Sequence, residues 1–249
     1  MDPQPHFDAA VVIPTVLRPS LVEAVRSVFA QTLAGRIQIL IGIDKPLGEP
    51  AILDRLRAEC PSRMHLTLLD LGYSTSARHG GIYSNAYSGA LRTILSYAAN
   101  SARVAYLDDD NWWGPTHLSD LARALAGHDW AFSRRWYVDP ATDAPLAVDR
   151  WESVGIGGAY AEMFGGFVDT SSLMLEKGRC HAVFPLWAIA MFPKGSGEDR
   201  MVFQALKEMK GRATGEATSF YRLNPEDGNH ARRLEWIAAA KAGTESDPR

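Results

Sequence analysis

Short apolar segments alternate with helical segments in the first half of this 249-residue chain, and the alternation limits the folds open to it. The apolar runs at 9–13, 37–43 and 64–69 predict buried strands, and the segments between them predict helices. This order implies a parallel sheet with right-handed crossovers and helices on both faces. We therefore expect the α/β fold class, with ligand groups in the loops that follow the strands.

The first predicted helix follows a start signal. Ser20 and, three residues later, Glu23 are typical of a capping box, in which each side chain bonds a backbone N–H of the first turn. Apolar residues then recur at helical spacing as far as Leu33. A second helix is predicted over 51–59. The strand at 9–13 should end at Pro14, because proline closes most strands.

The pattern becomes mixed in the second half. A polar stretch at 70–81 predicts a binding loop, which leads into a long helical segment that ends at Ala98. Turn residues between 130–138 and 146–151 predict a hairpin. Glycines at 155–166 predict a mobile segment. The other expected elements are strands over 103–107, 171–175 and 218–223 and helices over 115–126 and 197–210. Together these elements predict one domain with a mixed, mostly parallel sheet.

Charge and composition narrow the function. The formal net charge is −3, and no block of Lys or Arg interrupts the chain, which argues against binding nucleic acid or an anionic membrane. Cys60 and Cys180 lie too far apart for a disulfide framework or a zinc motif, so a reducing, cytoplasmic location is expected. No apolar stretch approaches the ~20 residues of a transmembrane helix. A soluble protein is expected.

Three carboxylates, Asp108, Asp109 and Asp110, directly follow the strand predicted over 103–107. Taken alone, such a run is usually a solvated loop or a helix cap. Here it lies at the edge where α/β sheets bind ligands. Mg²⁺ and Mn²⁺ prefer carboxylate oxygens together with substrate phosphates. The run therefore predicts a divalent cation, Mn²⁺ or Mg²⁺, held against a diphosphate.

Several segments resemble the motifs of glycosyltransferase family 2, in the family's order and over about four fifths of the chain. The resemblance implies the GT-A fold in one domain, 1–249. About 8–114 would bind the nucleotide sugar, about 115–235 the acceptor, and 236–249 would form a tail. It also implies inverting transfer by direct displacement. The matching segments are Val12-Ile13-Pro14-Thr15, Ser27-Val28-Phe29-Ala30-Gln31-Thr32, a strand ending in Asp44, Tyr106-Leu107-Asp108-Asp109-Asp110-Asn111-Trp112-Trp113-Gly114-Pro115, and Gly197-Glu198-Asp199.

The resemblance assigns residues to the donor site. Pro14 and Thr15 match the loop that lines the nucleotide. Asp44 matches a carboxylate that accepts a hydrogen bond from a pyrimidine ring N–H, although a turn residue would look the same. Arg78 matches the arginine of the family's R-N-x-G loop, where His79 replaces the usual Asn. The implied donor is a nucleotide-diphosphate sugar, with UDP favoured over GDP or dTDP.

The resemblance also assigns metal ligands. Asp108 and Asp110 occupy the outer positions of the D-x-D motif, with Asp110 as the direct ligand and Asp108 facing the ribose or the metal. Asp109 is grouped with the nucleotide-sugar-binding residues. Asn111 stands where many members have another Asp and is not counted as a ligand. His230 follows the last predicted strand, where some GT-A enzymes place a metal-binding His; a structural or exposed histidine is the alternative.

Asp199 is the expected catalytic base. By its position it could simply cap a helix, where the dipole favours acidic groups. The family's Glu-Asp pair instead supplies the base that takes the acceptor hydroxyl's proton, which is worth roughly 10²–10⁴ in rate. The metal would stabilise charge on the departing diphosphate. The transferred sugar, the acceptor (a sugar, a lipid-linked or a small molecule) and the oligomeric state, a homo-oligomer included, stay open.

Other functions remain as alternatives. A sugar-nucleotide pyrophosphorylase would carry a Gly-rich, basic signature after the first strand, where this chain has Pro14-Thr15-Val16-Leu17-Arg18-Pro19. A phosphatase with an aspartyl nucleophile would need Asp at the end of that strand. A non-catalytic nucleotide-sugar-binding protein would need neither the acidic run nor Asp199, so these residues favour an enzyme.

Overall fold

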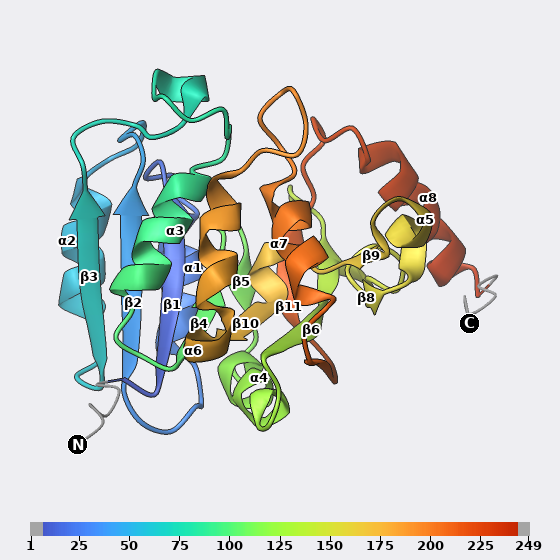
Figure 1. Ribbon diagram of the computed structural model, residues 1–249, viewed down its shortest axis with the longest axis horizontal. Helices are drawn as coiled ribbons and strands as arrows, with labels where there is room; N and C mark the ends of the chain where they lie inside the picture. The colour runs from blue at the N-terminus through green and yellow to red at the C-terminus, as the bar shows by residue number, and fades with distance from the viewer. Residues whose placement is uncertain (1–6, 244–249) are drawn as a thin grey trace.

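The computed structural model describes residues 7–243. Within this range, a mixed sheet of nine strands forms the centre of the fold, and Figure 1 shows how the elements are arranged. Its order is β3-β2-β1-β4-β10-β6-β11-β5, with β7 paired to β6. The neighbours β3, β2, β1 and β4 are parallel, whereas β10 runs antiparallel between β4 and β6. The strands are β1 (Ala9–Thr15), β2 (Ile37–Ile43), β3 (Met64–Asp70), β4 (Arg103–Tyr106), β5 (Trp112–Trp113), β6 (Trp130–Val138), β7 (Pro145–Val148), β10 (Leu173–Glu176) and β11 (Gly211–Arg222).

Helices cover both faces of this sheet, as the sequence predicts. The helices are α1 (Leu21–Phe29), α2 (Ala51–Glu59), α3 (Gly89–Ala98), α4 (His117–Leu125), α5 (Ala161–Phe164), α6 (Lys177–Cys180), α7 (Glu198–Leu206) and α8 (His230–Lys241). Side chains of β1 alternate between the two faces and divide the core. Val11 and Ile13 pack with α1, α2 and α4, whereas Ala10 and Val12 pack with α3, α7 and the 3₁₀ segment His181–Ala188. Within residues 7–243, no helix combines the length and apolarity needed to cross a bilayer.

Two expectations for the first βα unit are wrong. β1 does not stop at Pro14 but continues to Thr15. β4 pairs with β1 only from residue 10 to residue 12, so the missing N–H of Pro14 interrupts no ladder with β4. Ser20 makes no capping hydrogen bond. The carboxylate of Glu23 instead accepts a hydrogen bond from the guanidinium of Arg222 of β11 at 2.8 Å. A tertiary contact has replaced the local one.

The helix before Ala98 is also shorter than predicted, since α3 begins only at Gly89. Asn85 explains the delay. Its side-chain oxygen accepts hydrogen bonds from the backbone of Tyr87 and Gly89, and its amide donates to the carbonyl of Trp187. This side chain stabilises a turn where the helical pattern suggested another turn of helix.

The glycine-rich segment 155–166 is not an irregular loop. β8 (Gly155–Ile156) pairs with β9 (Gly166–Phe167), and α5 lies between them. Gly166 has φ 130°, and a Cβ there would lie 2.0 Å from the carbonyl oxygen of Gly155. The glycines therefore permit close backbone pairing.

Other boundaries differ mainly in the second half. The hairpin is confirmed as β6 and β7, although its second strand ends at Val148. β11 begins earlier than predicted, at Gly211. Its first half escaped prediction because it is exposed and lacks the apolar alternation typical of a strand. The helix predicted over 197–210 ends at Leu206. α8 includes the start of the segment 236–249, of which 244–249 lie outside the described residues.

Candidate active site

The acidic run lies where β4 ends beside β1, and its middle member is fixed by the first loop. The hydroxyl of Thr15 donates to Asp109 Oδ2 at 2.7 Å, and the N–H of Val16 lies 3.4 Å from the same oxygen. Burial raises the pKa of Asp109, although the charge of Arg18 opposes the rise. Asp109 and Thr15, both buried, therefore shape the site rather than form its surface.

Asp110 is the most accessible carboxylate of the run. Its side chain keeps 45% of its accessible surface, and Nη1 of Arg18 lies 2.7 Å from Oδ2. Surrounding protein, together with the charges of Asp108 and Asp109, raises the pKa of Asp110 to about 6. Arg222 fixes the backbone, since its guanidinium donates to the carbonyl of Asp110 at 2.7 Å. Asp110 thus offers an accessible carboxylate close to the charges of Asp108 and Asp109.

Asp108 connects the run to the second half of the chain. Arg92 of α3 lies 2.5 Å from Asp108 Oδ1 and 3.6 Å from Glu198 Oε1. The hydroxyl of Ser171 donates to Asp108 Oδ2 at 3.3 Å and accepts from the N–H of Asp108 at 3.1 Å. Asn111 donates to the same hydroxyl, so it supports the loop. Arg92 is therefore the link between the acidic run and α7.

Asp199 lies in the first turn of α7, next to Glu198. Its side chain is 26% exposed, and Oδ1 accepts from the backbone and guanidinium of Arg200 at 2.8 and 3.1 Å. Glu198 is buried; burial and the neighbouring charge of Asp199 raise its pKa to about 7, against the pull of Arg92. The predicted base therefore lies in the same charged cluster as Asp108, with Arg92 between them.

A buried ionic network adjoins this cluster at Asp169. Arg135 of β6 contacts Asp169 at 2.6 Å, Asp149 at 2.9 Å and Glu152 at 2.8 Å. Burial raises the pKa of Asp169 to about 6; Arg135 opposes the rise and the charge of Asp108 adds to it. Arg233 of α8 holds Glu152 from the other side at 2.6 Å. The network ties α8 and the segment after β7 to Asp169 at the site.

A cavity of about 620 Å³ opens at the ends of β2 and β3. Asp44 and His79 line it, and His79 Nδ1 lies 3.0 Å from Asp44 Oδ2. Burial would raise the pKa of Asp44, but hydrogen bonds from His79, Ser74 and Thr75 outweigh it and lower that pKa. The volume is within the usual range for small-molecule pockets of about 300–1,000 Å³.

Arg78 and His79, neighbours in the predicted binding loop, take different positions. Arg78 is exposed, and its guanidinium carbon lies 5.9 Å from the ring centre of Tyr87. It does not appear among the residues around the cavity, whereas its neighbour His79 does. The short 3₁₀ turn Ala77–His79 turns the two side chains in different directions.

The three predicted metal ligands, Asp108, Asp110 and His230, do not form one complete metal-binding site. Among residues 7–243, no group of three His, Cys, Asp or Glu side chains is arranged to hold a metal ion. His230 begins α8, and its Nδ1 is buried without a hydrogen-bond partner. Asp108 and Asp110 are held by Arg92 and Arg18. The donor set nevertheless fits a hard cation, because Asp110 is an accessible carboxylate with two further carboxylates next to it in the run.

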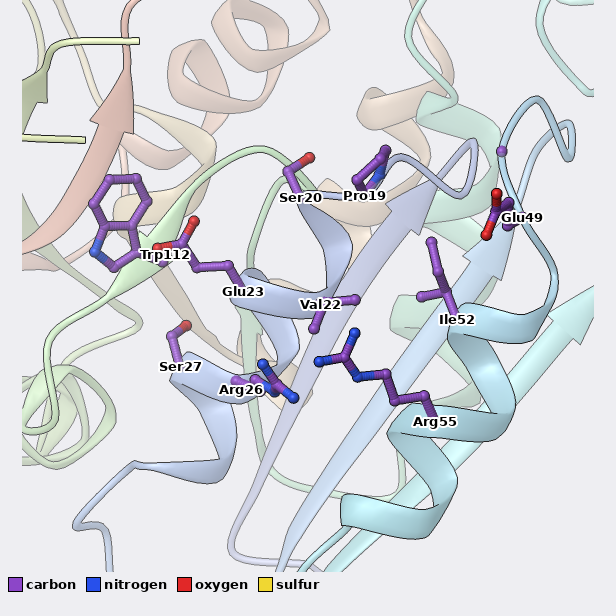
Figure 2. A pocket seen from close by; sticks show the side chains of 11 residues that line it. Pro19, Ser20, Val22, Glu23, Arg26, Ser27, Glu49, Ile52, Arg55 and Trp112 are labelled. Carbon is purple, nitrogen blue, oxygen red and sulfur yellow. The ribbon is translucent and has the colours of Figure 1, made fainter. Parts of the chain in front are cut away.

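A second cavity, of about 900 Å³, lies outside this cluster, against α1 and α2 (Figure 2). Its walls include Arg26, Arg55 and Trp112. Both arginines pair with Glu59 at the surface. The cavity is larger than the one at Asp44, and no carboxylate of the acidic run lines either of them. The Asp44 cavity differs in lying at the ends of two parallel strands, where α/β sheets bind ligands.

Comparison with solved structures identifies the class of fold. TarS from S. aureus superposes with a TM-score of 0.62 at 14% identity, covering 93% of this chain and 39% of that one. TarS 1-349 in complex with UDP-GlcNAc gives 0.62 at 13% identity, covering 90% of this chain and 60% of that one. Mannosyltransferase PcManGT from Pyrobaculum calidifontis, in complex with GDP-Man and Mn²⁺, gives 0.60 at 16%, covering 98% and 67%.

The chain therefore has the GT-A fold that the sequence predicted. It spans about two fifths of the TarS chain and about two thirds of the mannosyltransferase. No family model and no curated protein matches its sequence. At identities this low, the comparisons establish the fold, and the activity has to be argued from the site.

Proposed function

We propose that this protein is an inverting, metal-dependent glycosyltransferase of the family 2 type, which moves a sugar from a UDP-sugar to an acceptor hydroxyl. One observation carries the proposal: Arg92 joins Asp108, at the end of β4, to the first turn of α7 that holds Asp199. The proposed donor-side and acceptor-side carboxylates thus lie in one charged cluster, and a cavity of nucleoside size opens at the ends of β2 and β3. Support comes from neighbours solved with UDP-GlcNAc and with GDP-Man and Mn²⁺.

The residues divide into roles that their surroundings support. Asp110, with Asp108, would hold Mn²⁺ or Mg²⁺, which supplies positive charge against the diphosphate. Thr15 and Asp109 keep the first loop in place, while Pro14 lies one residue before the end of β1. Asp199 accepts the proton of the attacking hydroxyl. His230 remains a proposed additional ligand, on the strength of its unpartnered Nδ1.

Donor binding should depend on the metal, because a diphosphate would otherwise meet a cluster of carboxylates. We expect UDP to bind in the presence of Mn²⁺ and to lose most of its affinity in excess EDTA. Asp110→Ala should weaken binding with Mn²⁺ at least about tenfold, a loss typical of disturbed metal sites. Isothermal titration calorimetry measures both effects. Asp54→Ala, which removes an exposed acid of α2, is the control; undiminished UDP affinity in EDTA would contradict the metal requirement.

Transfer should invert the anomeric configuration. A single in-line displacement needs a base on the acceptor side, and Asp199, partly exposed at the start of α7, is the base that we propose. Proton NMR of the product made from an α-linked donor should show a β-glycoside. An α-glycoside would overturn the mechanism and the role of Asp199 together.

A further inference from the structure

The carboxylate of Asp44 has no free position for a nucleotide base. Oδ2 accepts from the hydroxyl of Ser74 at 2.8 Å and faces His79 Nδ1 at 3.0 Å. Oδ1 accepts from the N–H of Thr75 at 3.1 Å and from its hydroxyl at 3.4 Å. A carboxylate offers about four lone-pair positions, and these contacts occupy them. A ring N–H could reach Asp44 only by displacing part of the loop.

The same contacts determine the tautomer of His79. Asp44 is buried and ionised, since its hydrogen bonds lower its pKa. An ionised carboxylate can only accept, so Nδ1 of His79 must carry the hydrogen. In the neutral ring, Nε2 is then an acceptor. The ring lines the cavity and its side chain is 19% exposed.

The backbone of the loop keeps the ring in this position. Gly80 has φ 90°, in the left-handed region, and directly follows His79. A Cβ on Gly81 would lie 2.3 Å from the carbonyl carbon of Thr75. Both glycines thus allow the loop to fold tightly against the residues that hold Asp44.

We propose that His79, oriented by Asp44, is the residue that selects the nucleotide base, an inference that rests on the proposed use of a nucleotide-sugar donor. Nε2 accepts a hydrogen bond from a base that carries a ring N–H, such as uracil. Cytosine has a lone pair at the same ring position and would face the lone pair of Nε2. Asp44 acts as a positioning residue, through His79. UDP and CDP have the same size and charge but differ both at the ring nitrogen and at the neighbouring exocyclic group, so the preference is assigned to this contact by its loss in His79→Phe.

The test is calorimetric titration of UDP and CDP, with Mn²⁺, in mildly alkaline buffer where an imidazole is ordinarily neutral. The native protein should bind UDP at least about tenfold more tightly than CDP, since CDP leaves buried polar groups unpaired. His79→Phe keeps a ring of similar shape and should bring the two affinities within about threefold. Asp44→Asn frees the tautomer and should also reduce the preference. His181→Phe, at an exposed histidine of the segment His181–Ala188, should leave the preference unchanged.

The outcomes separate the inference from the proposed function. If UDP and CDP bind equally well to the native protein, or if His79→Phe keeps the preference, the assignment of His79 is overturned while nucleotide binding stands. If neither nucleotide binds, both proposals fail. Long-range ¹H–¹⁵N NMR of the native protein gives a second measurement that needs no variant: hydrogen on Nδ1 and a shift of Nε2 on addition of UDP support the inference, and hydrogen on Nε2 overturns it.

Discussion

Asp199→Asn is expected to slow sugar transfer at least about 100-fold while leaving the affinity for UDP nearly unchanged. The substitution keeps the shape of the side chain but removes its ability to take a proton, and a positioned base is worth roughly 10²–10⁴ in rate. Donor affinity should persist, because Asp199 lies on α7, whereas the residues that we propose for the donor follow β1, β2 and β4. Steady-state kinetics with UDP-sugar, together with calorimetry of UDP, measure the two quantities separately.

The control for Asp199 is Glu208→Gln, which removes an exposed acid just after the end of α7. Its transfer rate and UDP affinity should match those of the native protein. Equal losses of rate and UDP affinity in Asp199→Asn would mean that Asp199 holds the donor, and the division of roles between the acidic run and α7 would be wrong.

Arg135→Leu should destabilise the fold by about 3–5 kcal/mol, the usual cost of breaking a buried ion pair by removing one partner. Arg135 is 1% exposed and holds Asp149, Glu152 and Asp169, none of which can reach water easily. Its loss leaves three buried carboxyl groups with one fewer cation, and only Arg233 remains on Glu152. Urea denaturation followed by circular dichroism measures the change in the free energy of unfolding.

Arg134 provides a matched control for this experiment. It precedes Arg135 on the same strand, but its side chain is exposed because alternate residues of a strand point to opposite faces. Arg134→Leu should change the free energy of unfolding by no more than about 0.5 kcal/mol. Similar losses in the two variants would show that strand propensity, not the ionic network, accounts for the effect.

The sequence predicted several elements of the first half of the chain well because their signals are local. β2 and α2 have the predicted bounds, since a strand buried on both faces gives a continuous apolar run and an amphipathic helix repeats along itself. The place of Asp108–Asp110 after β4 follows from the same logic. β11 was mostly missed, because its first residues are exposed and polar and depend on pairing with β6.

Local sequence patterns could not predict the contacts within the candidate site, because these contacts join residues that are far apart in the chain. Arg92 has no distinguishing pattern around it in the sequence, yet it joins Asp108 to Glu198, which lies 106 positions later in the chain. Arg135 likewise looks no different from Arg134 until the sheet buries one and exposes the other. The capping box at Ser20 failed for a related reason, since Glu23 pairs with Arg222 instead.

The sequence by itself determined the strand–helix order and the edge of the sheet where the acidic groups lie, because periodicity and residue type act over a few neighbouring positions. Asp199 became a candidate base only through the family resemblance. Tertiary structure decided which charges and polar groups meet: Arg18 with Asp110, Arg92 with Asp108, and His79 with Asp44. The physical reason is that electrostatic and hydrogen-bond energies depend on distance in space and on burial, and neither can be read from separation along the chain.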